Sequence, residues 1–202
     1  MTIDTSNRPL PPAMLTRLRA RYAEPHRHYH AQAHIDALLR WLNVHAELAI
    51  DRRSIEAAIW FHDAIYDTRR NDNELQSAAL ARSELRAEGW KPEDIERVAV
   101  LVLATQHHNA DHDDHDAWLF LDLDLSVLAA ELAIYDRYSQ NIRAEFNWVP
   151  EADYRRGRSA VLASFQAREN IYRTPALKSV WEARARANLA RELAALQDPP
   201  FA

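Results

Sequence analysis

The 202-residue sequence contains no cysteine and only two glycines, Gly89 and Gly157. Without cysteine, the chain can form no disulfide, no thiolate zinc site and no cysteine nucleophile. Glycine-rich phosphate loops and dinucleotide-binding fingerprints need closely spaced glycines, which these two positions do not provide. A bound phosphate group would therefore have to be held by side chains or by a metal ion.

The sequence also lacks an excess of basic residues and a long apolar run. Its formal net charge is −5, so it does not resemble a basic nucleic-acid-binding surface, and nucleic acid is not an expected partner. No stretch reaches the roughly 20 apolar residues that span a bilayer, and the opening MTIDTSNRPLPP has no apolar signal-peptide core. We therefore expect a cytoplasmic protein with no membrane segment, whose oligomeric state stays open.

Hydrophobic residues recur with helical spacing along most of the chain. Asp51 is placed to cap a helix, and Pro92 and Pro175 are placed in first helical turns. The pattern predicts helices over about 11–24, 30–48, 52–62, 73–87, 92–106, 118–146 with a bend near 130, 150–172 and from 175 onward. Strand signals are weak, and there is no internal repeat or long linker. We expect an all-α single domain, residues 1–202, of about eight or nine helices.

Three histidine–aspartate pairs occur, and their surroundings differ. His62-Asp63 ends the apolar segment AAIWFHD, whereas the pairs at 112–113 and 115–116 lie in the polar run HHNADHDDHDA. We expect the polar run to be a solvated loop, although histidine-rich tracts can bind metal loosely. The apolar setting of His62-Asp63 is consistent with a helix C-terminus, where the dipole favours histidine, or with part of a site.

Further residues could join this pair in binding a divalent cation. His34 lies in the apolar segment YHAQAHIDALL, and Asp122 and Asp124 lie in WLFLDLDLSVL. Each group is costly to bury alone, and a shared cation would offset that cost. Imidazoles and carboxylates without sulfur accept several metals, so Mn, Mg, Fe, Ni, Co and Zn all fit. Alone, His34 could be a hydrogen-bonded histidine and the aspartates a helix cap, but the order His, His-Asp, Asp favours a metal site.

This order and these contexts resemble the HD superfamily of metal-dependent phosphohydrolases, and more narrowly the bacterial group of predicted HD phosphohydrolases. The segments that carry the resemblance are RHYHAQAHI, WFHDAIYD, DNELQSA, LATQHH, FLDLDLSVL and YRRGRSAVLASFQARENIYRT, from about Tyr22 to Thr174. The resemblance implies an HD-type helical bundle with a metal-site core over about 22–135 and C-terminal helices over about 136–197. The metal ligands that it implies are His34, His62, Asp63 and Asp124, with Asp124 preferred to Asp122.

Other residues near these segments are candidates for proton transfer or for a second metal. Glu74 is the preferred general base, and Asp67 is either an alternative base or a residue that orients a ligand histidine. Asn73 and Glu74 are equally consistent with an ordinary helix N-terminus. His107 and His108 follow an apolar helix; one of them could bind a second metal, as in some HD enzymes, or contact a metal ligand or the substrate. Asp122 is also a candidate for a second metal or for contact with a metal ligand.

Arg27, Arg158 and Arg168 are candidates for binding a phosphate group, because arginine binds phosphate oxygens in pairs. Arginines on long helices also commonly face water or pair with nearby acids. The predicted activity is hydrolysis of a small phosphate ester, such as a nucleotide, by a metal-activated water. The alternatives are a non-catalytic metal- or nucleotide-binding regulatory protein, a di-iron oxygenase-like HD enzyme, and a helical interaction module that binds no metal.

Overall fold

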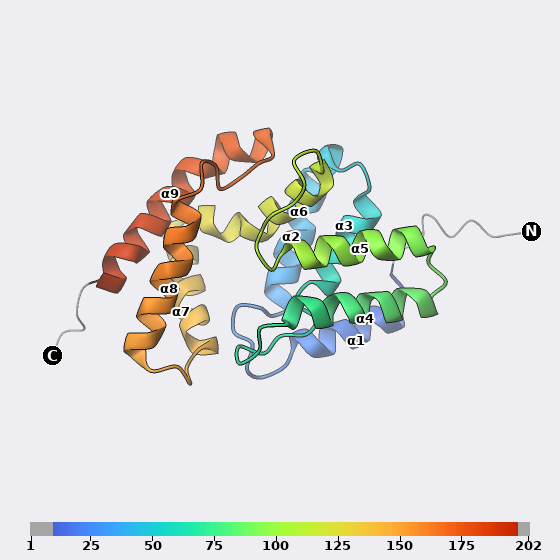
Figure 1. The fold of residues 1–202 in the computed structure, drawn as a ribbon, viewed down its shortest axis with the longest axis horizontal. Helices are drawn as coiled ribbons and strands as arrows, with labels where there is room; N and C mark the ends of the chain where they lie inside the picture. The colour runs from blue at the N-terminus through green and yellow to red at the C-terminus, as the bar shows by residue number, and fades with distance from the viewer. Residues whose placement is uncertain (1–9, 198–202) are drawn as a thin grey trace, which may run out of the picture. The chain divides into compact units, whose positions relative to one another are not determined.

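The computed structural model describes residues 10–197; the first nine residues, part of the segment predicted to lack a signal peptide, lie outside the described residues. Within residues 10–197 the chain is helical with no strand, so the all-α prediction is confirmed (Figure 1). The α-helices are α1 (Pro12–Tyr22), α2 (Gln32–Val44), α3 (Arg52–Phe61), α4 (Asn73–Ala87), α5 (Pro92–Ala104), α6 (His115–Asp124), α7 (Leu132–Glu145), α8 (Glu151–Gln166) and α9 (Pro175–Gln197). Two short 3-10 helices are η1 (Ala46–Leu48) and η2 (Leu125–Ala129). None of the described helices has the length and apolarity that crossing a bilayer requires.

Several helix ends lie where local sequence signals predict them. Asp51 caps α3, because its carboxylate accepts the backbone N–H of Ser54. Pro92 is the first residue of α5, and α4 spans the predicted range 73–87. Gly89 follows α4 with a φ of 75°, the left-handed conformation that glycine adopts without strain. The interactions that set these ends are made by neighbours in sequence.

The predicted end of the helix over 150–172 is wrong. Helix α8 stops at Gln166, and the backbone N–H groups of Ile171 and Tyr172, within the predicted helical range, donate instead to the Glu182 carboxylate on α9. The side chains of Ile171 and Tyr172 are buried. The chain therefore turns before Tyr172, and a carboxylate distant in sequence supplies the acceptor.

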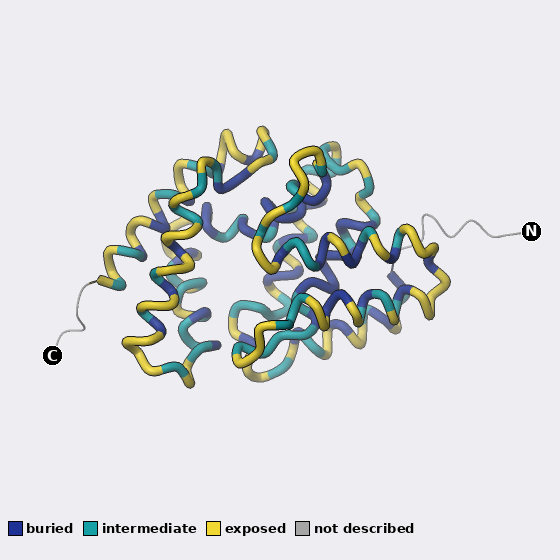
Figure 2. The backbone as a smooth tube through the Cα atoms, in the orientation of Figure 1, coloured by how far each residue is buried: buried dark blue, intermediate teal, exposed yellow. Residues whose placement is uncertain are grey.

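The polar run before α6 is only partly the solvated loop that the sequence predicts. The loop part is exposed in Figure 2, and the side chains of His112 and Asp113 are 85% and 98% exposed. Helix α6, however, begins within the run, and Asp116 is only 5% exposed. Its carboxylate accepts the backbone N–H groups of Ile50 and Asp51 at 2.8 and 2.7 Å. The prediction of a solvated 115–116 pair is therefore wrong for Asp116, which joins the starts of α3 and α6, whereas His115 is exposed.

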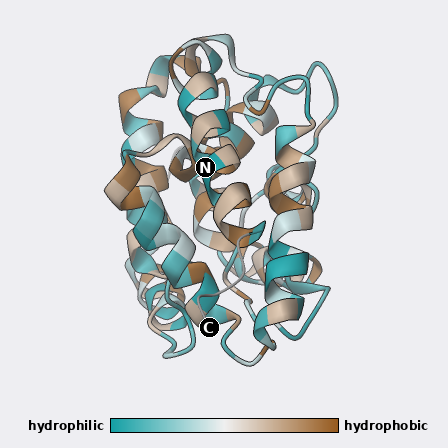
Figure 3. Ribbon diagram, turned by 90° about the vertical axis from the view of Figure 1, so that its left-hand side faces the viewer, coloured by the Kyte–Doolittle hydropathy of each residue, from teal (hydrophilic) through white to brown (hydrophobic). Residues whose placement is uncertain are grey.

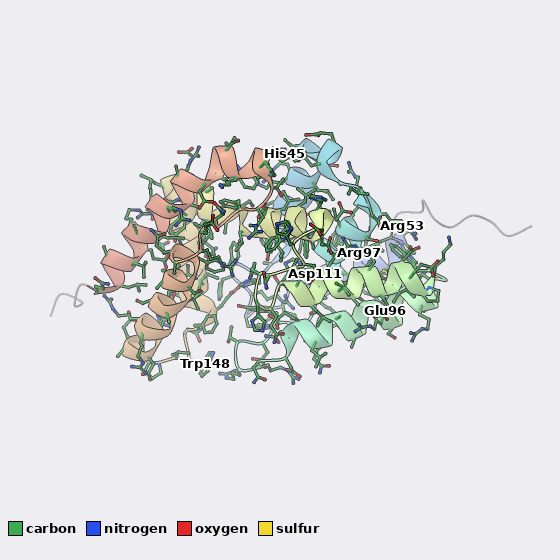
Figure 4. The ribbon with its side chains drawn as sticks, turned by 45° about the horizontal axis from the view of Figure 1, so that its top comes forward. His45, Arg53, Glu96, Arg97, Asp111 and Trp148 are labelled. Atoms are coloured by element: carbon green, nitrogen blue, oxygen red, sulfur yellow. The ribbon has the colours of Figure 1, made fainter. Side chains whose placement is uncertain are left out.

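The described residues group into two compact units, divided between Leu123 and Asp124; the single-domain assignment stays a prediction. In the first unit, α3 packs against α1, α2, α4 and α5, and its residues from Ala57 to Phe61 are all buried. Arg97 of α5, labelled in Figure 4, donates to both carboxylate oxygens of Asp114 at 2.5 and 2.7 Å. Asp114 in turn caps α6 through the Ala117 N–H. With its contacts to α1, α2, α4 and α5, helix α3 is the central helix of this unit.

In the second unit, α9 packs on η2 and on α8, and η2 contacts α7. The largest buried side chains here include Tyr135, Tyr172 and Trp181. Tyr172 donates its hydroxyl to the Leu125 carbonyl of η2, and the Asn188 amide donates to the Leu128 and Ala130 carbonyls. Figure 3 shows that the loops between helices are mostly hydrophilic. The predicted bend near Ala130 is confirmed, because η2 separates α6 from α7.

Candidate metal centre

Two histidines from neighbouring helices meet inside the first unit. His34 is the third residue of α2, and His62 is the C-cap residue of α3. Helices α2 and α3 pack against each other, and the two imidazoles are 5% and 2% exposed. Their Nε2 atoms lie 3.3 Å apart. The structure therefore brings together two of the residues that the sequence predicts as metal ligands.

The hydrogen bond of His62 Nδ1 fixes the ring so that its Nε2 atom faces His34 and Asp63. His62 Nδ1 lies 2.9 Å from the carbonyl oxygen of Ile59. Because a carbonyl oxygen can only accept, Nδ1 must carry the proton in this bond. In the neutral ring Nε2 then bears the lone pair. A histidine ligand held by a backbone carbonyl through its other nitrogen is the usual arrangement in metal sites.

Asp63 lies beside both imidazoles. Its Oδ2 atom is 3.0 Å from His62 Nε2 and 3.9 Å from His34 Nε2, and its side chain is 17% exposed. Burial by itself raises the pKa of the Asp63 carboxyl, but the charges that His62, His30 and His34 can carry outweigh burial and hold that pKa well below its usual range. The carboxylate is therefore ionised, which is the form that binds a cation.

Of the two neighbouring aspartates, Asp124 joins the histidines. One ligand atom from each of His34, His62 and Asp124 lies within 4.8 Å of the others. Asp124 is the last residue of α6, so this helix sets its position. Asp122 is 1% exposed and does not belong to this group. The preference for Asp124 agrees with this placement.

The spacing of the His34, His62 and Asp63 ligand atoms suits one divalent cation. Two nitrogens about 2.1 Å from one ion, at angles between octahedral and tetrahedral, lie about 3.0–3.4 Å apart. The observed separation of the histidine Nε2 atoms is 3.3 Å, and that between His62 Nε2 and Asp63 Oδ2 is 3.0 Å. The longer distance of 3.9 Å from His34 to Asp63 remains below the roughly 4.2 Å that opposite ligands on one ion would show. The residues present therefore fit a metal with mixed nitrogen and oxygen ligands.

Aromatic rings surround the histidine pair. Tyr29 lies 4.9 Å from the His34 ring, Phe120 lies 5.7 Å from the His62 ring, and His30 stacks on Tyr66 at 4.3 Å between ring centroids. Tyr29, His30, Tyr66 and Phe120 are not among the candidate site residues that the sequence predicts. The only available signal was that His30 precedes His34 by one helical turn, yet α2 begins after His30, at Gln32.

The two predicted proton acceptors lie in different settings. Asp67 shapes the loop before α4: its carboxylate accepts the Arg69 N–H, and its backbone N–H and carbonyl bond to the Asn73 side-chain amide. Asn73 and Glu74 do form the N-terminus of α4, as the sequence alternative expected, although the N-cap residue is Asp72 rather than Asn73. Glu74 is half-buried in the first turn of α4. Neither carboxylate belongs to the group of potential metal ligands.

His107 and His108 lie in the turn that follows α5. His107 is exposed and His108 is half-buried, with a positive φ of 45°. Among the described residues, neither histidine joins the group formed by His34, His62 and Asp124. A second metal bound by these histidines stays a prediction.

Arg27 does not present its guanidinium to solvent. It donates to the carbonyls of His30, Asp63 and Ala64 and to the carboxylate of Glu24, and its side chain is fully buried. Four of its five N–H groups are thereby used within the protein. We therefore do not retain Arg27 as a phosphate ligand.

Arg158 and Arg168 belong to the second unit. Arg158 is 9% exposed and donates to both carboxylate oxygens of Glu192, at 2.9 and 3.1 Å. Because Arg158 is paired with Glu192, we do not retain it as a phosphate ligand. Arg168 is half-buried, lies 4.6 Å from the Phe165 ring centroid, and has a pKa lowered by burial. A phosphate-binding role for Arg168 stays a prediction.

Comparisons of the chain with protein-family models, with curated proteins and with solved structures gave no match. The case for a function therefore rests on the geometry of the site and on the order of the residues that form it.

Proposed function

We propose that the protein is a metal-dependent phosphohydrolase of the HD type that acts on a small phosphate ester, such as a nucleotide. The observation that carries the proposal is that ligand atoms of the buried His34 and His62 and of Asp124 lie within 4.8 Å of one another, with Asp63 beside the two histidines. These residues follow one another along the chain in the order that resembles the HD superfamily. Both the donor chemistry and the distances support a divalent ion at this position.

Four side chains would hold the ion: His34, His62, Asp63 and Asp124. Two neutral imidazoles and two carboxylates balance the charge of a divalent cation, and Mn, Mg, Fe, Ni, Co and Zn all accept such ligands. When bound, the ion supplies Lewis acidity, which lowers the pKa of a coordinated water and neutralises charge on a phosphoryl group. The Ile59 carbonyl holds the His62 ring in the tautomer that this role needs.

Glu74 is the proton acceptor that we favour. The Asp67 carboxylate accepts the Arg69 N–H, and the Asp67 backbone forms hydrogen bonds with the Asn73 side chain. These contacts stabilise the loop. Within the described residues, no hydrogen bond or ion pair engages the half-buried Glu74 carboxylate. A carboxylate that makes no other bond can accept a proton during attack on a phosphate ester.

The proposal is tested by metal analysis and by hydrolysis assays on the same samples. The wild-type protein is incubated with Mn²⁺, Co²⁺, Ni²⁺, Mg²⁺, Zn²⁺ or Fe²⁺, and phosphate release is measured from a panel of nucleotides and phosphomonoesters. We expect at least one metal to bind with one ion or more per chain and to support turnover. His62→Ala should remove both binding and turnover.

A second histidine–aspartate pair provides the matched control. His112 and Asp113 are the same two residue types in the same order, but both side chains are almost fully exposed. His112→Ala should therefore keep metal binding and activity. Folded His62→Ala with unchanged binding and activity would refute the proposal.

Other outcomes would favour the alternatives. Stoichiometric metal without hydrolysis of any phosphate ester would favour a binding or regulatory protein. Two irons per chain would favour the di-iron oxygenase-like enzyme, and loss of the second iron in a His107→Ala variant would assign one of its ligands. No bound metal at all would leave a helical interaction module.

A further inference from the structure

A buried guanidinium joins the two chain segments that carry the candidate metal ligands. Arg27 Nη1 donates to the carbonyl of His30 at 3.1 Å and to the carbonyl of Asp63 at 2.6 Å. Arg27 Nη2 donates to the carbonyl of Ala64 at 3.2 Å. His30 precedes α2, while Asp63 and Ala64 follow α3. One planar side chain therefore connects the segment leading to His34 with the segment containing His62 and Asp63.

The surroundings fix the orientation of this guanidinium. The Glu24 carboxylate accepts Arg27 Nε–H at 3.0 Å, and the rings of Tyr22 and Tyr66 lie 5.2 and 5.4 Å from its central carbon. The Arg27 side chain is fully buried, whereas that of Glu24 is 37% exposed. A buried cation needs such partners, because an unpaired one would be costly to remove from water. The side chain is therefore held rigidly by groups on several sides.

We infer that Arg27 is a positioning residue, which sets the spacing between His34 and the His62–Asp63 pair that joint binding of one ion requires. This inference rests on the proposed metal centre. The two carbonyls after α3 belong to Asp63 itself and to the next residue, so movement of Arg27 would shift this ligand directly. The third carbonyl belongs to His30, four residues before His34 and just before α2 begins.

Lysine cannot replace arginine in this role. The guanidinium offers five donors in a fixed plane, whereas the lysine ammonium is a compact point charge with three donors. Arg27→Lys keeps the positive charge but cannot reproduce the planar set of bonds to three carbonyls and Glu24. Residues that orient metal ligands typically change metal affinity about 10- to 100-fold when substituted. We expect a loss in this range for Arg27→Lys.

Arg186 offers a matched control in the second unit. Its guanidinium donates to the carbonyls of Gln166, Arg168 and Glu169 and to the carboxylate of Glu182. The partners are thus of the same kind, three carbonyls and one carboxylate, but they lie far along the chain from the metal ligands. Arg186→Lys should lower thermal stability without changing metal affinity. The Arg186 side chain is 30% exposed, more than that of Arg27.

The experiment compares Co²⁺ binding by wild type, Arg27→Lys and Arg186→Lys, with affinity from titration calorimetry and ligand geometry from the visible absorption of bound Co²⁺. We expect at least about tenfold weaker binding and an altered spectrum for Arg27→Lys alone. Wild-type affinity and spectrum in folded Arg27→Lys would overturn the inference, as would an equal loss in Arg186→Lys. Failure of the wild type to bind any metal would instead refute the proposed metal centre.

A second variant decides the question if Arg27→Lys does not fold. Glu24→Gln removes the charge that lies 3.0 Å from Arg27 Nε and 3.7 Å from His26 Nε2, at a partly exposed position. We expect a smaller loss of Co²⁺ affinity in the same direction, with little change in melting temperature. Unchanged affinity together with an unchanged Co²⁺ spectrum in Glu24→Gln would overturn the inference.

Discussion

The buried pair of Arg158 and Glu192 supports a prediction that separates structural from phosphate-binding roles of arginine. The Glu192 carboxylate accepts hydrogen bonds from Nε and Nη2 of Arg158. It also accepts hydrogen bonds from the Tyr135 hydroxyl at 2.6 Å and the Ser139 hydroxyl at 2.9 Å. The side chains of Arg158 and Glu192 are 8% and 7% exposed. These bonds link α7, α8 and α9, so Arg158 is expected to stabilise the second unit rather than to hold a substrate.

Glu192→Leu removes the only carboxylate that the described contacts place against the Arg158 guanidinium. Breaking a buried ion pair by removing one partner typically costs about 3–5 kcal/mol, because the other charge stays buried. For a chain of this length, about 2–4 °C of melting temperature accompanies each kcal/mol. We therefore expect a fall of about 6–20 °C, measured by circular dichroism.

The double variant Arg158→Met/Glu192→Leu provides the second half of the measurement. It removes both charges and leaves the two hydroxyl donors without their acceptor, at a cost of about 1–3 kcal/mol each if they stay buried. If the double variant is more stable than Glu192→Leu, the ion pair and not the volume of the side chains accounts for the loss. Equal stability of wild type and Glu192→Leu would refute this reasoning.

The pH dependence of the same pair gives an independent measurement. Burial alone raises the pKa of the Glu192 carboxyl, but the hydrogen bonds and charge of Arg158 and the hydroxyl bonds outweigh burial and lower that pKa. A lowered pKa contributes stability that is present above the unfolded value, about 4.3, and is lost as the pH falls through the folded value. The difference in unfolding free energy between wild type and Glu192→Gln should therefore be full at pH 7 and shrink below about pH 4.

Two further predictions concern the first unit. A divalent metal at 100 times its dissociation constant should stabilise the wild type by about 2.7 kcal/mol and raise its melting temperature by about 5–10 °C. Differential scanning fluorimetry should show this shift in His112→Ala but not in His62→Ala. A shift of equal size in both variants would contradict the proposed metal site. Asp116→Ala removes the acceptor for two backbone N–H groups at the start of α3 and should cost about 1–3 kcal/mol in urea unfolding. Asp113→Ala, at the exposed neighbouring pair, should change stability by less than about 0.5 kcal/mol, and an equal loss in both variants would refute the role of Asp116.

The sequence predicts best the features that depend on neighbouring residues. The bounds of α4, the cap at Asp51 and the start of α5 at Pro92 agree with the structure. It predicts less well the ends that depend on distant partners. Helix α8 ends before the predicted position, and Glu182, distant in sequence, accepts the N–H groups of Ile171 and Tyr172 beyond it.

The candidate site divides along the same line. The order His34, His62-Asp63, Asp124 was visible in the sequence. The structure places ligand atoms of His34, His62 and Asp124 within 4.8 Å of one another, and Asp63 beside the two histidines. The hydrogen-bond partners of Arg27, by contrast, could not be predicted from the sequence. The sequence made Arg27 a candidate phosphate ligand, yet its partners include the carbonyls of residues up to 37 positions away.

The amino-acid sequence alone determined the all-α class, most helix bounds and the types of residue able to bind a metal, because helical periodicity, capping and ligand chemistry are local properties. Only the tertiary structure decided that Asp124 rather than Asp122 joins the two histidines, that Asp116 is buried, and that Arg27 bonds to backbone. Those outcomes depend on which helices pack together, since packing sets the distances between side chains that lie far apart along the chain.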